Sequence, residues 1–156
     1  MIQFASIARV MGVLLFLFGL MMATTIGFSL YYHSPDILPL LSASGITLGS
    51  GILLFVLGLQ REVHIGKREG YLIVALGWIF MTLFGMLPFL LSGVIPEVTN
   101  AFFETMSGLT TTGASILDDI EAVPKGILLW RSLTQWIGGM GIIVLTVAIL
   151  PLLGIG

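Results

Sequence analysis

The sequence predicts an all-α membrane protein whose transmembrane helices enclose one short re-entrant helix and loop. Three observations predict this class. Hydrophobic residues make up 57% of the 156 residues and charged residues only 9%, with a mean hydropathy of +1.12, whereas a soluble domain carries roughly 25% charged residues. Four apolar segments are long enough to cross a bilayer, which takes about 20 helical residues. A polar stretch, Thr110–Ser115, lies between the last two of these segments.

The first two apolar segments predict a pair of transmembrane helices. They cover Phe4–Tyr32 and about Ile37–Gln60. Between them, His33–Asp36 (HSPD) predicts a turn, because proline lacks a backbone donor and restricts the residue before it. The second segment contains Gly45 and Gly49 in a G-x-x-x-G pattern, which favours close approach by another helix, although glycine is common in transmembrane helices generally.

The third and fourth apolar segments flank the polar stretch. The third covers about Tyr71–Ser92 and follows the polar linker Gln60–Gly70. Pro88 near its end predicts a kink or a last helical turn there. The fourth covers about Pro124–Leu150, and its proline suits the first turn of a helix.

The region between these two segments, Gly93–Val123, is too polar to cross the membrane and too apolar for an ordinary exposed loop. Within it we expect a short helix over about residues 100–109, capped by Asn100 or Thr99. Its apolar residues recur at helical spacing: Phe102, Phe103, Met106 and Leu109. About ten residues cannot span a bilayer, so the chain is expected to enter the membrane and turn back.

The segment Thr110–Gly113 (TTTG) has the composition of an ion-binding loop. Extended backbone presents carbonyl oxygens that can replace the hydration shell of an alkali cation. Threonine adds a hydroxyl and favours extended backbone, and Gly113 permits unusual dihedral angles. A plain turn after a helix is the alternative. A nucleotide-binding loop is excluded, because no Gly-Lys-Ser/Thr follows the glycine.

The distribution of charge predicts the orientation. Four of the six basic residues lie near the N-terminus and in the 60–70 linker: Arg9, Arg61, Lys67 and Arg68. By the positive-inside rule, these parts and the C-terminus are cytoplasmic and residues 93–123 are external. The external region contains four acidic residues: Glu97, Asp118, Asp119 and Glu121. They either concentrate cations at a pore mouth or simply cover an outer loop.

Other functions find little support in the composition. Cysteine is absent, which excludes disulfides and thiol nucleophiles, and a net charge of -2 gives no reason to expect a nucleic-acid partner. His33 and His64 have no second ligand at metal spacing. With no Ser/His/Asp arrangement or paired carboxylates, we expect no enzyme.

The aromatic residues are expected to lie mostly near the membrane interfaces. Trp78 and Trp130 fit such a belt, and Trp136 is the tryptophan that we expect to be buried.

Two stretches together resemble a known family. FFETMSGLTTTGAS, followed about 15 residues later by WRSLTQWIGGMG, resembles the TrkH-like membrane subunits of the Trk/Ktr/HKT superfamily of potassium transporters. The resemblance covers the whole chain and implies an N-terminal helix pair with a cytoplasmic linker (1–66) and one M1–P–M2 unit (67–156). Within that unit, M1 covers about 71–92, the pore helix about 100–109, the filter 110–113 and M2 about 124–150.

The resemblance also implies roles for individual residues. Thr110, Thr111, Thr112 and Gly113 would form one of four filter strands around a central pore, with K⁺ bound at Thr111, Thr112 and Gly113. Gly113 matches the filter glycine that is associated with preference for potassium over sodium. Glu104 in the pore helix and Arg131 in M2 would pair and support the filter rather than bind ions. The glycines of QWIGGMG (Gln135–Gly141) would serve close packing.

The expected function is therefore potassium transport across the inner or plasma membrane, in which K⁺ is the transported ion and no covalent cofactor takes part. One filter strand cannot surround an ion, so we expect the chain to be part of a longer protein with further M1–P–M2 units. Those units would otherwise come from other subunits, or from four copies of this chain in a homotetrameric cation channel. A cytoplasmic nucleotide-binding regulatory subunit is a further expected partner. The rival hypothesis is a non-conducting helical scaffold or partner-binding subunit.

Overall fold

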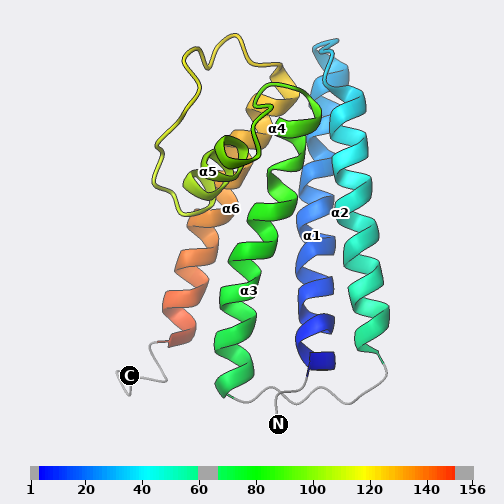
Figure 1. Ribbon diagram of the computed structural model, residues 1–156, viewed down its shortest axis with the longest axis vertical. Helices are drawn as coiled ribbons and strands as arrows, with labels where there is room; N and C mark the ends of the chain where they lie inside the picture. Colours follow the sequence, from blue (N-terminus) through cyan, green and yellow to red (C-terminus); the bar gives the residue numbers. More distant parts are fainter. Residues whose placement is uncertain (1–3, 60–66, 150–156) are drawn as a thin grey trace.

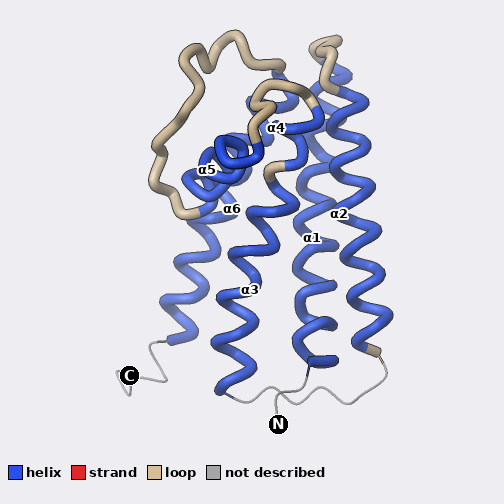
Figure 2. The backbone as a smooth tube through the Cα atoms, viewed as in Figure 1, coloured by secondary structure: helices blue, strands red, loops and turns tan. Residues whose placement is uncertain are grey.

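The computed structural model describes residues 4–59 and 67–149, with side chains for 4–59 and 68–143. Its described part consists of helices and loops without strands (Figure 2). Three segments are long and apolar enough to cross a membrane: Phe4–Tyr31, Ile37–Gly58 and Arg68–Leu91. The predicted all-α membrane class is therefore confirmed. Most of the predicted cytoplasmic linker, including Arg61 and His64, lies outside the described residues.

The predicted N-terminal helix pair is present. Helix α1 (Phe4–Tyr31) and helix α2 (Ile37–Gly58) lie side by side along their whole length (Figure 1). The turn between them falls at HSPD, as predicted, and His33 within it has a positive φ of 50°. This pair forms one side of the molecule. Helices α3 and α6 pack against α1, and α4 packs against α2.

Glycines determine how closely α1 and α2 approach, but they are not the predicted ones. A Cβ atom on Gly51 would lie 2.7 Å from a backbone nitrogen of α1, and Gly12 and Gly58 face equally close contacts. At Gly45 and Gly49, by contrast, a Cβ atom would have no neighbour within 4 Å among the described residues. The G-x-x-x-G prediction is therefore wrong for contacts within this chain. At 3.6 residues per turn, Gly51 and Gly58 share one face of α2 whereas Gly45 and Gly49 lie on another.

The third predicted span is broken near its end. Helix α3 (Lys67–Gly85) is followed by the five-residue helix α4 (Leu87–Leu91). Pro88 lies in the first turn of α4, where its missing N–H costs nothing. The carbonyl of Gly85, at the end of α3, accepts a hydrogen bond of 2.8 Å from the indole nitrogen of Trp130. A side chain thus satisfies one of the backbone groups that a helix end leaves unpaired.

Trp130 is the centre of the packed interior, contrary to prediction. It is fully buried, and its ring meets that of Phe18 edge-on at 5.1 Å. Trp136, which we expected to be buried, is 54% exposed. The two tryptophans belong to the same helix but are six residues apart, so they point in different directions. Composition alone cannot tell which of them faces α1 and α3.

The re-entrant segment begins with helix α5 (Val98–Leu109) and ends where helix α6 (Lys125–Ile149) begins. Figure 1 shows that α5 lies in the upper half of the molecule and that the loop after it returns to the upper end of α6. The helix starts earlier than predicted, with Glu97 at its N-cap and no side-chain cap bond. Asn100 instead donates to the carboxylate of Glu97 at 2.6 Å, so the predicted capping role is wrong.

The buried face of α5 also differs from the predicted apolar face. Phe103 is 46% exposed, although Leu109 is fully buried. All the other buried positions of the helix carry small or polar residues: Ala101, Glu104, Thr105, Ser107 and Gly108. A face made of such residues lets α5 come close to α3 and α6. Its larger aromatic side chains lie outside this face, half-buried at Phe102 and exposed at Phe103.

Candidate functional site

The first two threonines of the TTTG segment close helix α5. Thr110 is the C-cap, the N–H of Thr111 donates to the Gly108 carbonyl at 3.0 Å, and the N–H of Thr112 donates to the Ser107 carbonyl at 3.0 Å. These two bonds form the Schellman pattern of helix ends. The prediction of extended backbone is therefore wrong for Thr110 and Thr111, because the helix termination uses them. Irregular backbone begins at Thr112.

Thr111 and Gly113 hold the segment in an unusual conformation. Thr111 has a φ of 57° and Gly113 a φ of 76°. Left-handed backbone is rare for a β-branched residue and costs about 1–3 kcal/mol, so it persists only where its surroundings enforce it. The expectation that Gly113 adopts an unusual dihedral angle is confirmed. No atom of the described chain lies within 4 Å of where its Cβ would be, so its backbone angle, not crowding within this chain, calls for glycine.

Two polar ties fix the chain directly after the segment. The hydroxyl of Ser107 donates to the carbonyl of Ala114 at 2.6 Å. The carboxylate of Glu104 accepts hydrogen bonds from the hydroxyl of Ser115 at 3.0 Å and from the N–H of Ile116 at 2.9 Å. Both anchors are on α5, and both partners lie beyond Gly113. The strained residues are therefore enclosed in a short loop whose two ends are bound to the same helix.

Arg131 of α6 completes the surroundings of Glu104. Its Nε lies 2.7 Å from Glu104 Oε1, and the two side chains are 15% and 1% exposed. A buried carboxylate is strongly unfavourable unless it is paired and hydrogen-bonded, and here it has a cation, a hydroxyl and a backbone N–H as partners. The ion pair suggested by the family resemblance is present in the structure. We call Glu104, Arg131, Ser107 and Ser115 the polar clasp.

Close backbone contacts seat α5 between α3 and α6. A Cβ on Gly138 of α6 would overlap the carbonyl of Leu109, and one on Gly85 of α3 would lie 2.8 Å from Thr105. Gly108 of α5 faces the side chain of Thr134 in the same way. The packing role predicted for the QWIGGMG glycines thus applies to Gly138. Gly139 and Gly141 make only ordinary contacts.

The polar segment itself is exposed in this chain. All six residues of Thr110–Ser115 are exposed, and the hydroxyls of Thr110 and Thr112 lie 2.9 Å from each other. Non-helical backbone at membrane depth is stable only where other protein covers it or where it lines a water-filled space. No group of three or more acidic, His or Cys side chains in the described residues is placed to hold a metal ion. The oxygens available to a cation in this segment are thus backbone carbonyls and hydroxyls.

A second polar cluster, which the sequence did not reveal, joins the turn between α1 and α2 to the start of α6. Asp36 accepts a hydrogen bond from the N–H of Ile127 at 2.8 Å, and Ser34 accepts one from the N–H of Lys125 at 3.2 Å. The hydroxyl of Ser29 donates to Asp36. These side chains satisfy first-turn donors of a helix that begins about 90 residues later. The sequence predicted a turn with polar side chains at HSPD. Nothing in its spacing indicated that these side chains would bind the first turn of α6.

The ionisation of Asp36 follows from these contacts. Burial raises the pKa of this carboxyl, but hydrogen bonds from Ser29, from Ser34 and from the backbone of Ile127 lower it by more. The net effect is a pKa below the ordinary value of 3.8. Asp36 is therefore negatively charged near neutral pH. This charge interacts favourably with the positive, N-terminal end of the α6 dipole.

Comparisons with known proteins extend these observations. The TrkH family model, described as a cation transport protein, matches residues 49–156. The Trk system potassium uptake protein TrkH of Halomonas elongata is 44% identical over 96% of this chain, and its Escherichia coli K12 counterpart is 40% identical over 99%. The crystal structure of the potassium transporter TrkH from Vibrio parahaemolyticus superposes with a TM-score of 0.90 at 42% identity and covers 99% of this chain. The chain spans about a third of the length of these relatives, with 31%, 32% and 33% of each covered.

Proposed function

The chain belongs to the TrkH family of cation transport proteins, and from this premise we propose that it forms one quarter of a potassium-conducting pore. Residues Thr110–Gly113 supply one filter strand, and three further M1–P–M2 units supply the others. Residues 1–66 form the accompanying helix pair and linker, and residues 67–156 form the pore unit. The transported ion is K⁺, the ion that the names of the relatives specify.

The observation that carries this proposal is the loop at the end of α5, which is hydrogen-bonded to that helix on both sides but exposed. A strained threonine and a left-handed glycine are held between ties to Ser107 and Glu104, yet the residues between the ties are exposed. A segment that is anchored at both ends and yet exposed fits one side of a pore, whose other sides further M1–P–M2 units would form. Three such neighbours would cover its sides and leave its oxygens facing a shared axis.

The chemistry of the segment fits an alkali cation. Carbonyl oxygens of Thr111, Thr112 and Gly113 would replace water around a dehydrated K⁺, and threonine hydroxyls would supply further oxygens. The C-terminal end of α5, which carries a partial negative charge, lies directly before these residues. Glu104 and Arg131 neutralise each other, so they position the strand and do not bind the ion.

The orientation that we propose follows from the described charges. Arg9 lies near the start of α1 and Arg68 at the start of α3, at the lower end in Figure 1. Asp118, Asp119 and Glu121 belong to the loop above the filter segment. With basic residues inside, the N-terminus is cytoplasmic and the pore loop external, in a cell membrane. A nucleotide-binding regulatory subunit, which the family resemblance implies, would bind on the cytoplasmic side.

Replacement of Gly113 tests the filter assignment. We expect Gly113→Ser in the complete protein to lower the ratio of K⁺ to Na⁺ uptake by about ten-fold, because a side chain here strains the backbone that presents the carbonyls. Uptake in cells that lack other potassium transporters provides the measurement. Gly93→Ser is the matched control, since Gly93 also has a positive φ of 72° and open surroundings but lies in the loop before α5.

The two variants distinguish an effect on the filter from an effect of backbone strain at any loop glycine. Equal loss in both would mean that strain anywhere in the loops impairs uptake. An unchanged K⁺/Na⁺ ratio in Gly113→Ser would remove the filter assignment and leave the scaffold hypothesis. A homotetramer of this chain alone predicts rubidium flux through the isolated chain in vesicles.

A further inference from the structure

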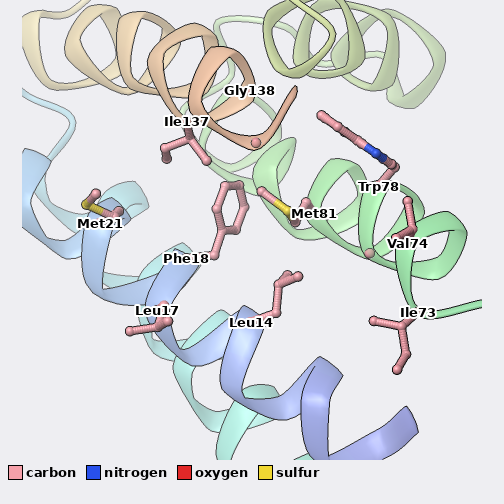
Figure 3. A pocket seen from close by; sticks show the side chains of 12 residues that line it. Leu14, Leu17, Phe18, Met21, Ile73, Val74, Trp78, Met81, Ile137 and Gly138 are labelled. Atoms are coloured by element: carbon pink, nitrogen blue, oxygen red, sulfur yellow. The ribbon is translucent and has the colours of Figure 1, made fainter. Parts of the chain in front are cut away.

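An apolar cavity lies between three helices, on the cytoplasmic side of the pore helix in the proposed orientation. Its volume is about 460 Å³, and α1, α3 and α6 all contribute to its lining. Figure 3 shows Leu14 and Phe18 of α1, Met81 of α3 and Ile137 of α6 around the same space. We call it the lateral cavity, because lining residues such as Leu17 and Val74 are partly exposed and it therefore opens to the side of the molecule.

The lining of the lateral cavity selects an apolar occupant. Of its twelve residues, nine have large apolar side chains, three are glycines and none is charged. Water gains too few hydrogen bonds in such a space to fill it stably. The volume is within the range of roughly 300–1,000 Å³ that is typical of ligand pockets. In a bilayer, the apolar chain that can enter from the side is the acyl chain of a lipid.

A cation lies at the end of a groove that joins this cavity. The groove is lined by Arg9, Val10 and Val13, and it shares Leu14 and Leu17 with the lateral cavity. From Arg9 to Leu17 the helix rises about 12 Å, so the groove leads from the cytoplasmic end of α1 toward mid-membrane. The guanidinium group of Arg9 stacks over the ring of Phe55 at 5.6 Å, which holds it beside the groove without neutralising its charge.

We propose that the groove and the lateral cavity together bind one anionic phospholipid of the cytoplasmic leaflet. Arg9 contacts the phosphate, and one acyl chain follows the Val13–Leu17 side of α1 into the cavity. Gly138 lines this cavity and also contacts the carbonyl end of α5. The bound chain thus packs against the part of α6 that supports the pore helix. This inference does not depend on potassium conduction, because the same contacts would exist in a non-conducting protein.

Native mass spectrometry of the complete protein, after delipidation in mild detergent, tests the headgroup contact. We expect phosphatidylglycerol to be retained about five-fold more than phosphatidylcholine with the same acyl chains, and Arg9→Gln to abolish that preference. Arg68→Gln is the matched control, because Arg68 is an exposed cation at the same end of the molecule. Equal retention of the two lipids, or an equal effect of both variants, would overturn the proposal.

Photo-crosslinking tests the acyl-chain site. A phosphatidylglycerol with a diazirine midway along one acyl chain should label residues of α1, α3 or α6 that line the cavity. Gly77→Leu should reduce this labelling several-fold, because Gly77 lines the cavity and its Cβ would be 3.6 Å from Leu14. Gly45→Leu adds the same side chain at a position where no atom of the described chain would lie within 4 Å of the new Cβ, and it should leave labelling unchanged.

A second cavity variant guards against misfolding. Gly141→Leu approaches the same space from α6, where a Cβ would be 3.9 Å from Trp78, and should reduce labelling in the same way. A thermal melt identifies any variant that has unfolded. Labelling that both cavity variants leave intact, or no labelling of the wild-type cavity because another protein segment fills it, would overturn the proposal.

Discussion

The helix pair α1–α2 and the polar clasp around α5 are held together by different means. Between α1 and α2, glycines bring the backbones together, and buried hydroxyls such as those of Thr25 and Thr47 bond to carbonyls of their own helix. In the clasp, by contrast, hydroxyl and carboxylate groups bind other segments: Ser107 binds Ala114, and Glu104 binds Ser115, Ile116 and Arg131.

The difference follows from what each region must satisfy. A helix pairs its own backbone groups, so two helices in lipid need only close packing to associate. An irregular loop has unpaired backbone groups and needs polar partners to hold one conformation. The polar clasp therefore fixes the conformation of the loop after α5, whereas the contacts between α1 and α2 only hold the two helices together.

The largest effect is expected at the centre of the clasp. Glu104→Ala leaves Arg131 without its partner and frees Ser115 and Ile116, and loss of one member of a buried pair costs about 3–5 kcal/mol. Potassium uptake should fall to background, and the melting temperature of the purified protein should drop. Arg131→Ala should have a similar effect, and the double replacement should be less than additive.

Glu97→Gln is the control for this series, because Glu97 is a carboxylate at the N-cap of the same helix but is exposed. Its effect on uptake should be small. Strict additivity of Glu104→Ala and Arg131→Ala would show that the two residues act independently and would contradict the clasp.

A smaller effect, on stability alone, is expected between α1 and α2. Gly51→Ala places a methyl group 2.7 Å from the backbone of α1, and such overpacking costs about 1–3 kcal/mol. The melting temperature should fall while the K⁺/Na⁺ ratio of uptake stays unchanged. Gly49→Ala, on the same helix but in open space, should leave both quantities unchanged. Altered selectivity in Gly51→Ala would show that the two regions are not separate in function.

The smallest effect is expected at Asp36, which joins the helix pair to α6. Its pKa is lower in the folded protein than in the unfolded chain, so its contribution to stability is present above the ordinary pKa near 3.8 and lost as pH falls through the folded value. Melting curves between pH 6 and pH 3 should therefore show a decline that Asp36→Asn reduces. We expect Asp36→Asn to cost about 0.5 kcal/mol near neutral pH, because the amide keeps an acceptor oxygen but loses the negative charge that interacts with the N-terminal end of the α6 dipole.

Asp118→Asn provides the comparison for that titration, since Asp118 is exposed in the loop between α5 and α6. It should leave the pH dependence of the melting temperature intact. A decline below pH 4 that is the same in wild type and Asp36→Asn would contradict the assigned role of Asp36.

The sequence predicted the course of the chain better than its contacts. Long apolar runs, the HSPD turn and Pro88 indicated the helices and their breaks, because hydropathy and proline chemistry act locally. Three contacts depend on which helix faces lie together. Trp130 is buried, Gly51 and not Gly49 meets α1, and the N–H of Ile127 donates to Asp36. Such facts arise only from tertiary packing.

Within the candidate site, the same limit applies to Thr110 and Thr111. The β-branched residues indicated extended backbone, but the last turn of α5 requires both for its C-terminal hydrogen bonds. Glu104 and Arg131 are 27 positions apart, so only the resemblance to a known family suggested that they pair. No local pattern pointed to the ties of Ser107 to Ala114 or of Ser115 to Glu104.

The most direct test of the central claim, that the clasped loop is one strand of an ion filter, is to locate the ion itself. Crystals of the complete protein grown in rubidium should show anomalous density beside the carbonyl oxygens of Thr111, Thr112 and Gly113. The density should weaken when sodium replaces rubidium. Ordered loops without anomalous density next to these oxygens would show that Thr110–Gly113 is not a filter strand.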